Sequence, residues 1–229
     1  MIHGHYFLTR RPDRLSSAFA AYWRQVHAPL TADIPQIRRY VQSLRVPTPP
    51  GDVFAGILST YDAVDEFWLD SPAALAAAIQ TDALLGKALP DMTNVVDIAR
   101  TEAFFGRDHV MIDGAPPEGS IKGVWLLKRR PDMTPQAYRD HWLGPHADCI
   151  RALPGVRRYV QCHPLEDAEF GSARNWDGVV HIWFDDIAAM HAAFTGPEGA
   201  LAVEDGPRLF DMDAMRFFHA REHVVVAAR

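Results

Sequence analysis

The sequence predicts an α+β fold in which two ferredoxin-like β-α-β-β-α-β repeats face each other through their sheets and enclose a barrel. Three observations lead to this prediction: the chain repeats itself, each copy shows the same order of apolar strands and amphipathic helices, and a turn-rich segment separates the copies. With 229 residues, of which 48% are hydrophobic, the chain is long enough to bury a substantial core.

The internal repeat keeps one register over the first part of each copy. LTRRPD at 8–13 recurs as LKRRPD at 127–132, and YWRQVHAPL at 22–30 aligns at the same shift with HWLGPHADC at 141–149. In both copies a tryptophan precedes a histidine by four positions. Chance does not maintain a register over so long a segment, so the halves are homologous.

The boundaries of the halves follow from turn chemistry. IDGAPPEG at 112–119 contains two glycines and a Pro-Pro pair, which is typical of a linker. We therefore expect a first repeat at 1–110, a linker at 111–119 and a second repeat at 120–229.

Each repeat is expected to contain the same elements in the same order. An apolar strand, HGHYFLT or KGVWLLK, leads through an Arg-Pro-Asp turn into an amphipathic helix. In the second repeat Thr134–Pro135 predicts the start of this helix and Pro145 predicts its end, with His146 at the C-terminal edge. The strand RRYVQ follows, then a strand in VDEFWL or VVHIWF, a second helix and a final strand. Helices cover one face of such a sheet, so the other face of each copy is free to cover that of the other copy.

The composition excludes several classes of function. A formal net charge of −6 and a sequence pI of about 6.0 argue against a nucleic-acid partner. Two cysteines without a CxxC pair argue against a disulfide framework and a zinc ribbon. The N-terminus lacks the order of a secretion signal and no apolar run reaches about eighteen residues, so we expect a cytoplasmic protein without a membrane partner.

Several phrases resemble the EthD domains of the dimeric α+β barrel superfamily. The resemblance lies in KRRPD at 128–132, YRDHWLGPHAD at 138–148, PGVRRYVQCH at 154–163 and WDGVVHIWFDD at 176–186. It implies an intramolecular dimeric α+β barrel and a protein that acts on small molecules, in ether or aromatic degradation or on polyketide phenols. Related barrels include cyclases, cofactor-free monooxygenases and haem proteins, so the fold leaves the chemistry open.

The candidate catalytic residues are His146, His181, Glu66 and His27. A neutral imidazole takes a proton from a phenol or an activated carbon near neutral pH. Glu66 either orients a histidine or, with a pKa raised by burial, serves as the acid. The alternative for His27 and His146 is that they only stabilise the C-terminal ends of helices.

Strand alternation indicates which side chains bind the substrate. We expect one face of RYVQCH at 158–163, its counterpart at 39–44, and one face of VVHIWF at 179–184 to point into the cavity. The expected substrate-binding residues, which offer hydrogen bonds or flat apolar walls to an aromatic ring, are Tyr40, Tyr159, Gln42, Gln161, His163, Trp68, Trp183 and Phe7.

Together these features predict a cofactor-independent, lyase-type enzyme that cleaves a C–C or C–O bond, by dehydration or decarboxylation, in an aromatic small molecule of a catabolic or polyketide pathway. Three alternatives stay open: a haem-binding barrel, a non-catalytic carrier of a hydrophobic metabolite, and a cofactor-free monooxygenase or cyclase. No metal is expected, because HGH at 3–5 is the only close histidine pair, although a histidine-carboxylate site across the two sheets is a minor alternative. A homodimer is compatible with the sequence.

Overall fold

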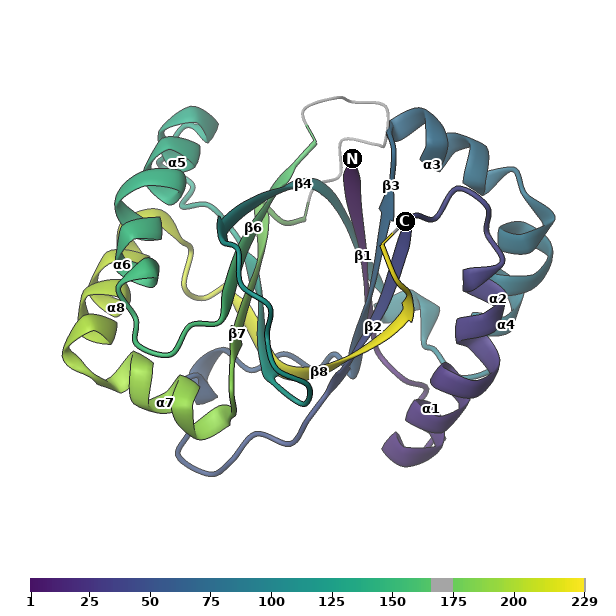
Figure 1. Cartoon of the computed structure of the whole chain (residues 1–229), viewed down its shortest axis with the longest axis horizontal. Coiled ribbons are helices and arrows are strands. Elements are labelled where there is room, and N and C mark those ends of the chain that lie inside the picture. The colour runs from purple at the N-terminus through teal and green to yellow at the C-terminus, as the bar shows by residue number, and fades with distance from the viewer. Residues whose placement is uncertain (166–174, 229) are drawn as a thin grey trace.

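The computed structural model describes residues 1–165 and 175–228. Its strands form one closed antiparallel barrel in the order β1-β3-β2-β8-β5-β7-β6-β4 (Figure 1). The strands are β1 (Ile2–Leu8), β2 (Arg39–Arg45), β3 (Ala63–Leu69), β4 (Glu102–Ile112), β5 (Ile121–Leu127), β6 (Arg158–Pro164), β7 (Gly178–Phe184) and β8 (Arg216–Val226). This arrangement confirms the predicted fold class.

Two long strands join the repeats. Within each repeat the order is ferredoxin-like, β4-β1-β3-β2 and β8-β5-β7-β6. The eleven-residue strand β4 pairs with β1 through Gly106 and then with β6, and β8 likewise pairs first with β5 and then with β2. The two sheets are therefore hydrogen-bonded at both seams. One chain closes the barrel and leaves no sheet edge open.

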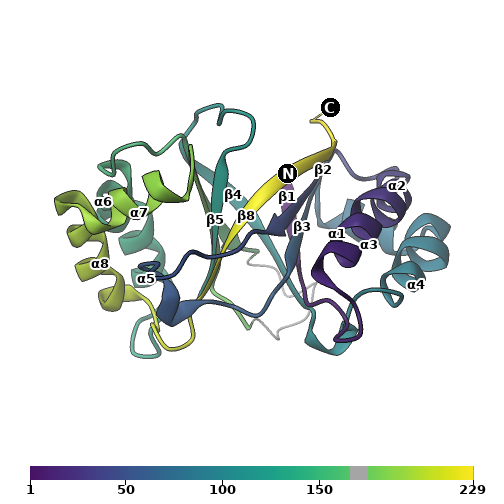
Figure 2. The ribbon, with the colours of Figure 1, turned by 90° about the horizontal axis from the view of Figure 1, so that it is seen from below.

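Two layers of helices cover the outside of the barrel on opposite sides, one layer from each repeat (Figures 1 and 2). Short 3₁₀ turns lie at Ala55–Ile57 and Ile98–Arg100. None of the helices in the described ranges is long and apolar enough to span a membrane. The helices are α1 (Ser16–Tyr22), α2 (Ala28–Ala32), α3 (Pro72–Ile79), α4 (Leu89–Met92), α5 (Pro135–His141), α6 (Ala147–Arg151), α7 (Ile187–Thr195) and α8 (Pro197–Leu209).

The first helix of the second repeat begins as predicted but does not end at Pro145. The Thr134 hydroxyl accepts a hydrogen bond from the Ala137 amide, with Pro135 at the first helical position. A π-helical turn at Trp142–His146 then contains Pro145 and continues into α6. The wider turn accommodates a residue without an N–H, so His146 lies inside a continuous helical segment, and the expectation of a helix C-terminus there is wrong.

Strand alternation separates two kinds of core. Val180 and Ile182 of β7 pack under the helices of the second repeat, whereas Val179 packs inside the barrel. His181 and Trp183 therefore share the barrel side with Val179. The apolar core inside the barrel includes Phe7, Val64, Phe104, Val124, Val179 and Phe218.

Candidate active site

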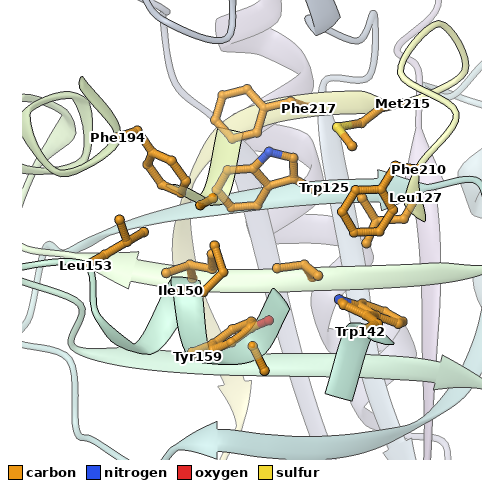
Figure 3. Close-up of a cluster of buried hydrophobic side chains, with 14 of the residues drawn as sticks. Trp125, Leu127, Trp142, Ile150, Leu153, Tyr159, Phe194, Phe210, Met215 and Phe217 are labelled. Atoms are coloured by element: carbon orange, nitrogen blue, oxygen red, sulfur yellow. The ribbon is translucent and has the colours of Figure 1, made fainter. Parts of the chain in front are cut away.

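An apolar pocket of about 220 Å³ lies in the second repeat, between the outer face of its sheet and helices α6 and α8. The loop before β3 of the first repeat supplies Phe54 and Ile57 to its rim, so both repeats complete it. Figure 3 shows several of its walls, which include Trp125, Tyr159, Ile150, Phe194 and Phe210.

His146 lines this pocket and is oriented by a carboxylate. Its Nδ1 atom lies 2.9 Å from Oδ2 of Asp205 on α8, and the same carboxylate lies 3.0 Å from Nε2 of His141. A carboxylate that accepts the Nδ1–H leaves Nε2 of His146 as the basic nitrogen. Burial lowers the pKa of His146, against the opposing effect of Asp205, so the imidazole is neutral and able to accept a proton near pH 7.

Tyr159 lies in the wall of the same pocket. The Tyr159 oxygen accepts a hydrogen bond from Nε2 of Gln161, at 2.5 Å. Burial raises the pKa of Tyr159, so the phenol stays protonated. Tyr159 is fully buried, and the described residues show no acceptor for its proton.

The first repeat contains the same histidine-aspartate pair at the matching place, but its pocket is filled. Nδ1 of His27 lies 2.9 Å from Oδ2 of Asp91, and Nε2 lies 3.0 Å from the Thr31 hydroxyl. The Tyr40 hydroxyl donates to Asp65 at 2.9 Å. The corresponding cavity measures only about 40 Å³, so His27 has neither a free nitrogen nor space for a substrate.

The remaining catalytic candidates lie inside the barrel. His181 and Glu66 face each other there, with 3.5 Å between Nε2 and Oε1, and Glu66 forms a buried ion pair with Lys122. Trp68 and Trp183 line a cavity of about 360 Å³ at the barrel mouth, and Phe7 belongs to the apolar core beneath it. The four candidate residues thus occupy three separate places.

Five of the expected binding residues point away from the barrel, against the sequence-based expectation. They lie beneath the helices. Gln42 donates to the carbonyl of Trp23 in a second π turn, Trp23–His27, and Gln161 donates to the carbonyl of Trp142. His163 stacks on Trp142 at 4.1 Å between ring centroids. Tyr40 and Tyr159 share this outer face. The expectation assumed that the small apolar side chains of β6 pack under helices, whereas Cys162 in fact packs in the barrel core.

Sequence reasoning missed the two aspartates that orient the histidines. Asp91 and Asp205 occupy matching positions in LPDM at 89–92 and VEDG at 203–206, so extending the repeat alignment through the second helix would have found them. It also passed over His3, His5 and Asp108 inside the barrel, although HGH was visible as a pair on an expected strand.

Neither histidine environment fits a haem. The pocket beside His146 is smaller than the ~300–1,000 Å³ typical of sites for drug-sized ligands. Nε2 of His181 lies 2.9 Å from Nε2 of His5 and 3.5 Å from Oε1 of Glu66, which leaves no space for a macrocycle on that nitrogen.

Both repeats match one known protein family. Residues 11–99 and 130–213 each match the profile of the EthD domain, one match in each repeat. No curated protein matches the chain at a significant level.

Solved structures share the whole fold at low sequence identity. An anthrone oxidase-like protein superposes with a TM-score of 0.67 at 11% identity, covering 100% of this chain and 94% of its own. A candidate monooxygenase from Lactobacillus acidophilus gives 0.58 at 8% identity, with 97% and 94% covered. A candidate chlorite dismutase gives 0.56 at 12% identity, with 98% and 95% covered. At such identities the likeness shows the fold alone.

Proposed function

The chain belongs to the EthD domain family, and we propose that it is an enzyme that begins lyase-type chemistry on a small phenolic molecule by proton transfer to His146, without a cofactor. The observation that carries this proposal is the carboxylate-oriented imidazole of His146, which borders an aromatic pocket and whose Nε2 has no hydrogen-bond partner among the described residues. Such a pairing of base and orienting group is what general-base catalysis requires.

The size and walls of the pocket favour a single aromatic ring. An engineered protein cavity of about 150 Å³ binds benzene, so a cavity of about 220 Å³ is suited to a substituted ring rather than a fused polycyclic system. Trp125 and Phe194 offer flat surfaces for that ring.

The proposed step moves one proton in a closed cycle. Nε2 of His146 takes the proton of a phenol or of an activated carbon, and the Asp205 carboxylate stabilises the imidazolium that forms. When the C–C or C–O bond breaks, the imidazolium returns the proton to the carbon or to the leaving oxygen, which regenerates the neutral base.

A second candidate reaction shares this first step. Two of the fold relatives are described as an anthrone oxidase-like protein and a candidate monooxygenase. A phenolate formed at His146 could instead react with molecular oxygen supplied from solution: a ring C–H carbon is oxidised to a carbonyl with one oxygen atom, the other oxygen atom leaves as water, and the substrate supplies all four electrons. Oxygen uptake during turnover, followed with an oxygen electrode, supports this oxygenase, and turnover without uptake supports the lyase.

The proton transfer is testable with 4-nitrophenol, whose phenolate absorbs in the visible. We expect the bound probe to show the phenolate band at a pH where the free probe is mainly neutral, and the band to disappear in His146→Gln. His27→Gln is the matched control, because it changes the equivalent imidazole in the filled pocket. Absence of binding, a neutral bound probe, or an undiminished band in His146→Gln overturns the proposal.

Turnover is then measured on substituted phenols and hydroxybenzoates, with products identified by mass spectrometry. Loss of a general base typically lowers rates by about 100- to 10,000-fold, and we expect that loss in His146→Gln but not in His27→Gln. A non-catalytic carrier predicts instead that the histidine variant binds as tightly as the wild type and that neither protein turns over any compound.

A further inference from the structure

Four buried side chains converge in the middle of the barrel, on the opposite side of the sheet from His146. They are His3 and His5 of β1, Glu66 of β3 and His181 of β7. One ligand atom from each lies within 4.8 Å of all the others. His5 and Glu66 are cross-strand partners, so the antiparallel pairing itself brings them together.

The spacing of these atoms resembles a coordination shell. Nε2 of His5 lies 2.9 Å from Nε2 of His181, and Oε1 of Glu66 lies 3.5 Å from Nε2 of His181 and 3.7 Å from Nε2 of His3. Four ligands at about 2.0–2.1 Å from a tetrahedral metal ion lie about 3.4 Å from one another. The three contacts scatter around that value.

His3 is oriented as metal-binding histidines usually are. Its Nδ1 atom lies 2.8 Å from Asp108, whose carboxylate also accepts a hydrogen bond from the Trp68 indole at 2.9 Å. This leaves Nε2 of His3 directed at the cluster, where it is buried and has no hydrogen-bond partner within residues 1–165 and 175–228. Carboxylates that hold the second nitrogen of a ligating histidine are a recurring feature of metal sites.

The contacts of Glu66 also suit a cation. Its carboxylate forms a buried ion pair with Lys122. Lys122 bonds to the other oxygen, Oε2, and leaves Oε1 for the cluster.

We propose that His3, His5, His181 and Glu66 bind one divalent transition-metal ion. Three imidazoles with one carboxylate favour Zn²⁺, Fe²⁺, Co²⁺, Ni²⁺, Cu²⁺ or Mn²⁺ over the hard ions Mg²⁺ and Ca²⁺. The site is independent of the proposed function, because no ligand touches the pocket of His146.

The charges around the site and its opening agree with this assignment. The Lys122 ammonium forms ion pairs with both Glu66 and Glu222, and its Nζ lies 2.8 Å from Oε1 of Glu222. Two carboxylates therefore offset one ammonium next to the site. The cavity of about 360 Å³ at the barrel mouth is lined by His3, Glu66 and His181 and provides an entry path. It also leaves space for a small additional ligand on the metal.

The test uses Co²⁺ and Zn²⁺ as probes on chelator-treated full-length protein. We expect one Co²⁺ per chain with visible d–d absorption, displaced by one equivalent of Zn²⁺ in calorimetry. His5→Gln and His181→Gln should each weaken binding at least 10- to 100-fold. His219→Gln, which changes a buried imidazole that is hydrogen-bonded to Asp52 outside the cluster, should bind as the wild type does.

Thermal unfolding shows whether each variant folds, and X-ray absorption of the Zn²⁺-loaded wild type tests the ligands without any substitution. A shell of three imidazoles with an oxygen ligand supports the assignment. Failure to bind one equivalent, a shell with sulfur or with oxygen alone, or unchanged affinity in the folded cluster variants overturns it. His146→Gln should bind Co²⁺ normally, so a failure of the proposed function does not carry over to this site.

Discussion

The two repeats contain the same histidine-aspartate pair, but only in the second does the histidine border a pocket large enough for a ligand. In the first repeat the Thr31 hydroxyl forms a hydrogen bond with Nε2 of His27. The aligned residue in the second repeat is Ile150, whose side chain cannot form a hydrogen bond. Asp65 accepts a hydrogen bond from Tyr40, and its counterpart is Val180, which cannot accept one from Tyr159. At these two positions the first repeat has polar side chains that bond to its histidine and tyrosine, and the second has apolar side chains that line the pocket.

This difference suggests a division of roles between the two repeats of the fused chain. The first repeat buries its polar groups against one another, as a stable core requires. The second repeat places His146 at a pocket and takes an aromatic wall from the loop of the first, at Phe54. In this interpretation the first repeat serves as scaffold and lid, and the second carries the site.

The largest change in activity is expected from replacing Asp205, and Asp91 in the first repeat is its control. Asp205→Asn removes the charge that stabilises the His146 imidazolium and favours the wrong tautomer, so we expect turnover of a phenolic substrate to fall by about 100- to 10,000-fold. Asp91→Asn makes the same change beside His27 and should leave turnover within a factor of about two. The measurement is kcat for both variants, and equal losses in the two would contradict the division of roles.

Much of this arrangement could be predicted from the chain, because hydrophobic periodicity and an internal repeat are written in local sequence. The face of the sheet on which each strand residue lies was harder to predict from the sequence. For β7 the phase was correct, since Val180, Ile182 and Phe184 form an apolar set under the helices. For β6 the phase was inverted, because Gln161 satisfies its polar group by reaching a carbonyl exposed by the π turn, a feature that no sequence period announces.

The candidate site was harder to predict, since it depends on contacts between distant elements. His146 was identified from its repeated phrase, but its partner Asp205 lies on a different helix. His181 and Glu66 lie 3.5 Å apart inside the barrel and away from His146, a contact that the sequence analysis did not specify. The outer pocket is lined by Ile150 and Val180, where the first repeat has Thr31 and Asp65. Apolar residues at these positions form no recognisable sequence motif, so the pocket could not be predicted.

The next largest effect concerns Asp65, which the second repeat replaces. Burial raises the pKa of Asp65 to about 7, above its unfolded value, against the opposing hydrogen bonds from Trp23 and Tyr40. The folded state then binds more protons than the unfolded one, so the contribution of Asp65 to stability is largest below about pH 4 and decreases as the pH rises to about 7.

Asp65→Asn cannot ionise, and it should therefore gain stability relative to the wild type by about 2–4 kcal/mol between pH 4 and pH 7. The measurement is the free energy of unfolding of both proteins by denaturant titration across that range. A difference that does not change with pH would show that Asp65 has an ordinary pKa and that its network is not strained by burial.

The smallest expected effect restores in the second repeat the hydroxyl of the first. Ile150→Thr places a hydroxyl where Thr31 bonds to His27, so it should compete for Nε2 of His146. A net hydrogen bond contributes about 1 kcal/mol, so we expect the affinity for 4-nitrophenol to fall about fivefold, with a weaker phenolate band. Calorimetry and absorbance together separate the two effects. Thr31→Ile, the reciprocal control, should leave binding unchanged, because the cavity beside His27 is too small for the probe. If Ile150→Thr binds as the wild type does, the open nitrogen of His146 is not what distinguishes the two repeats.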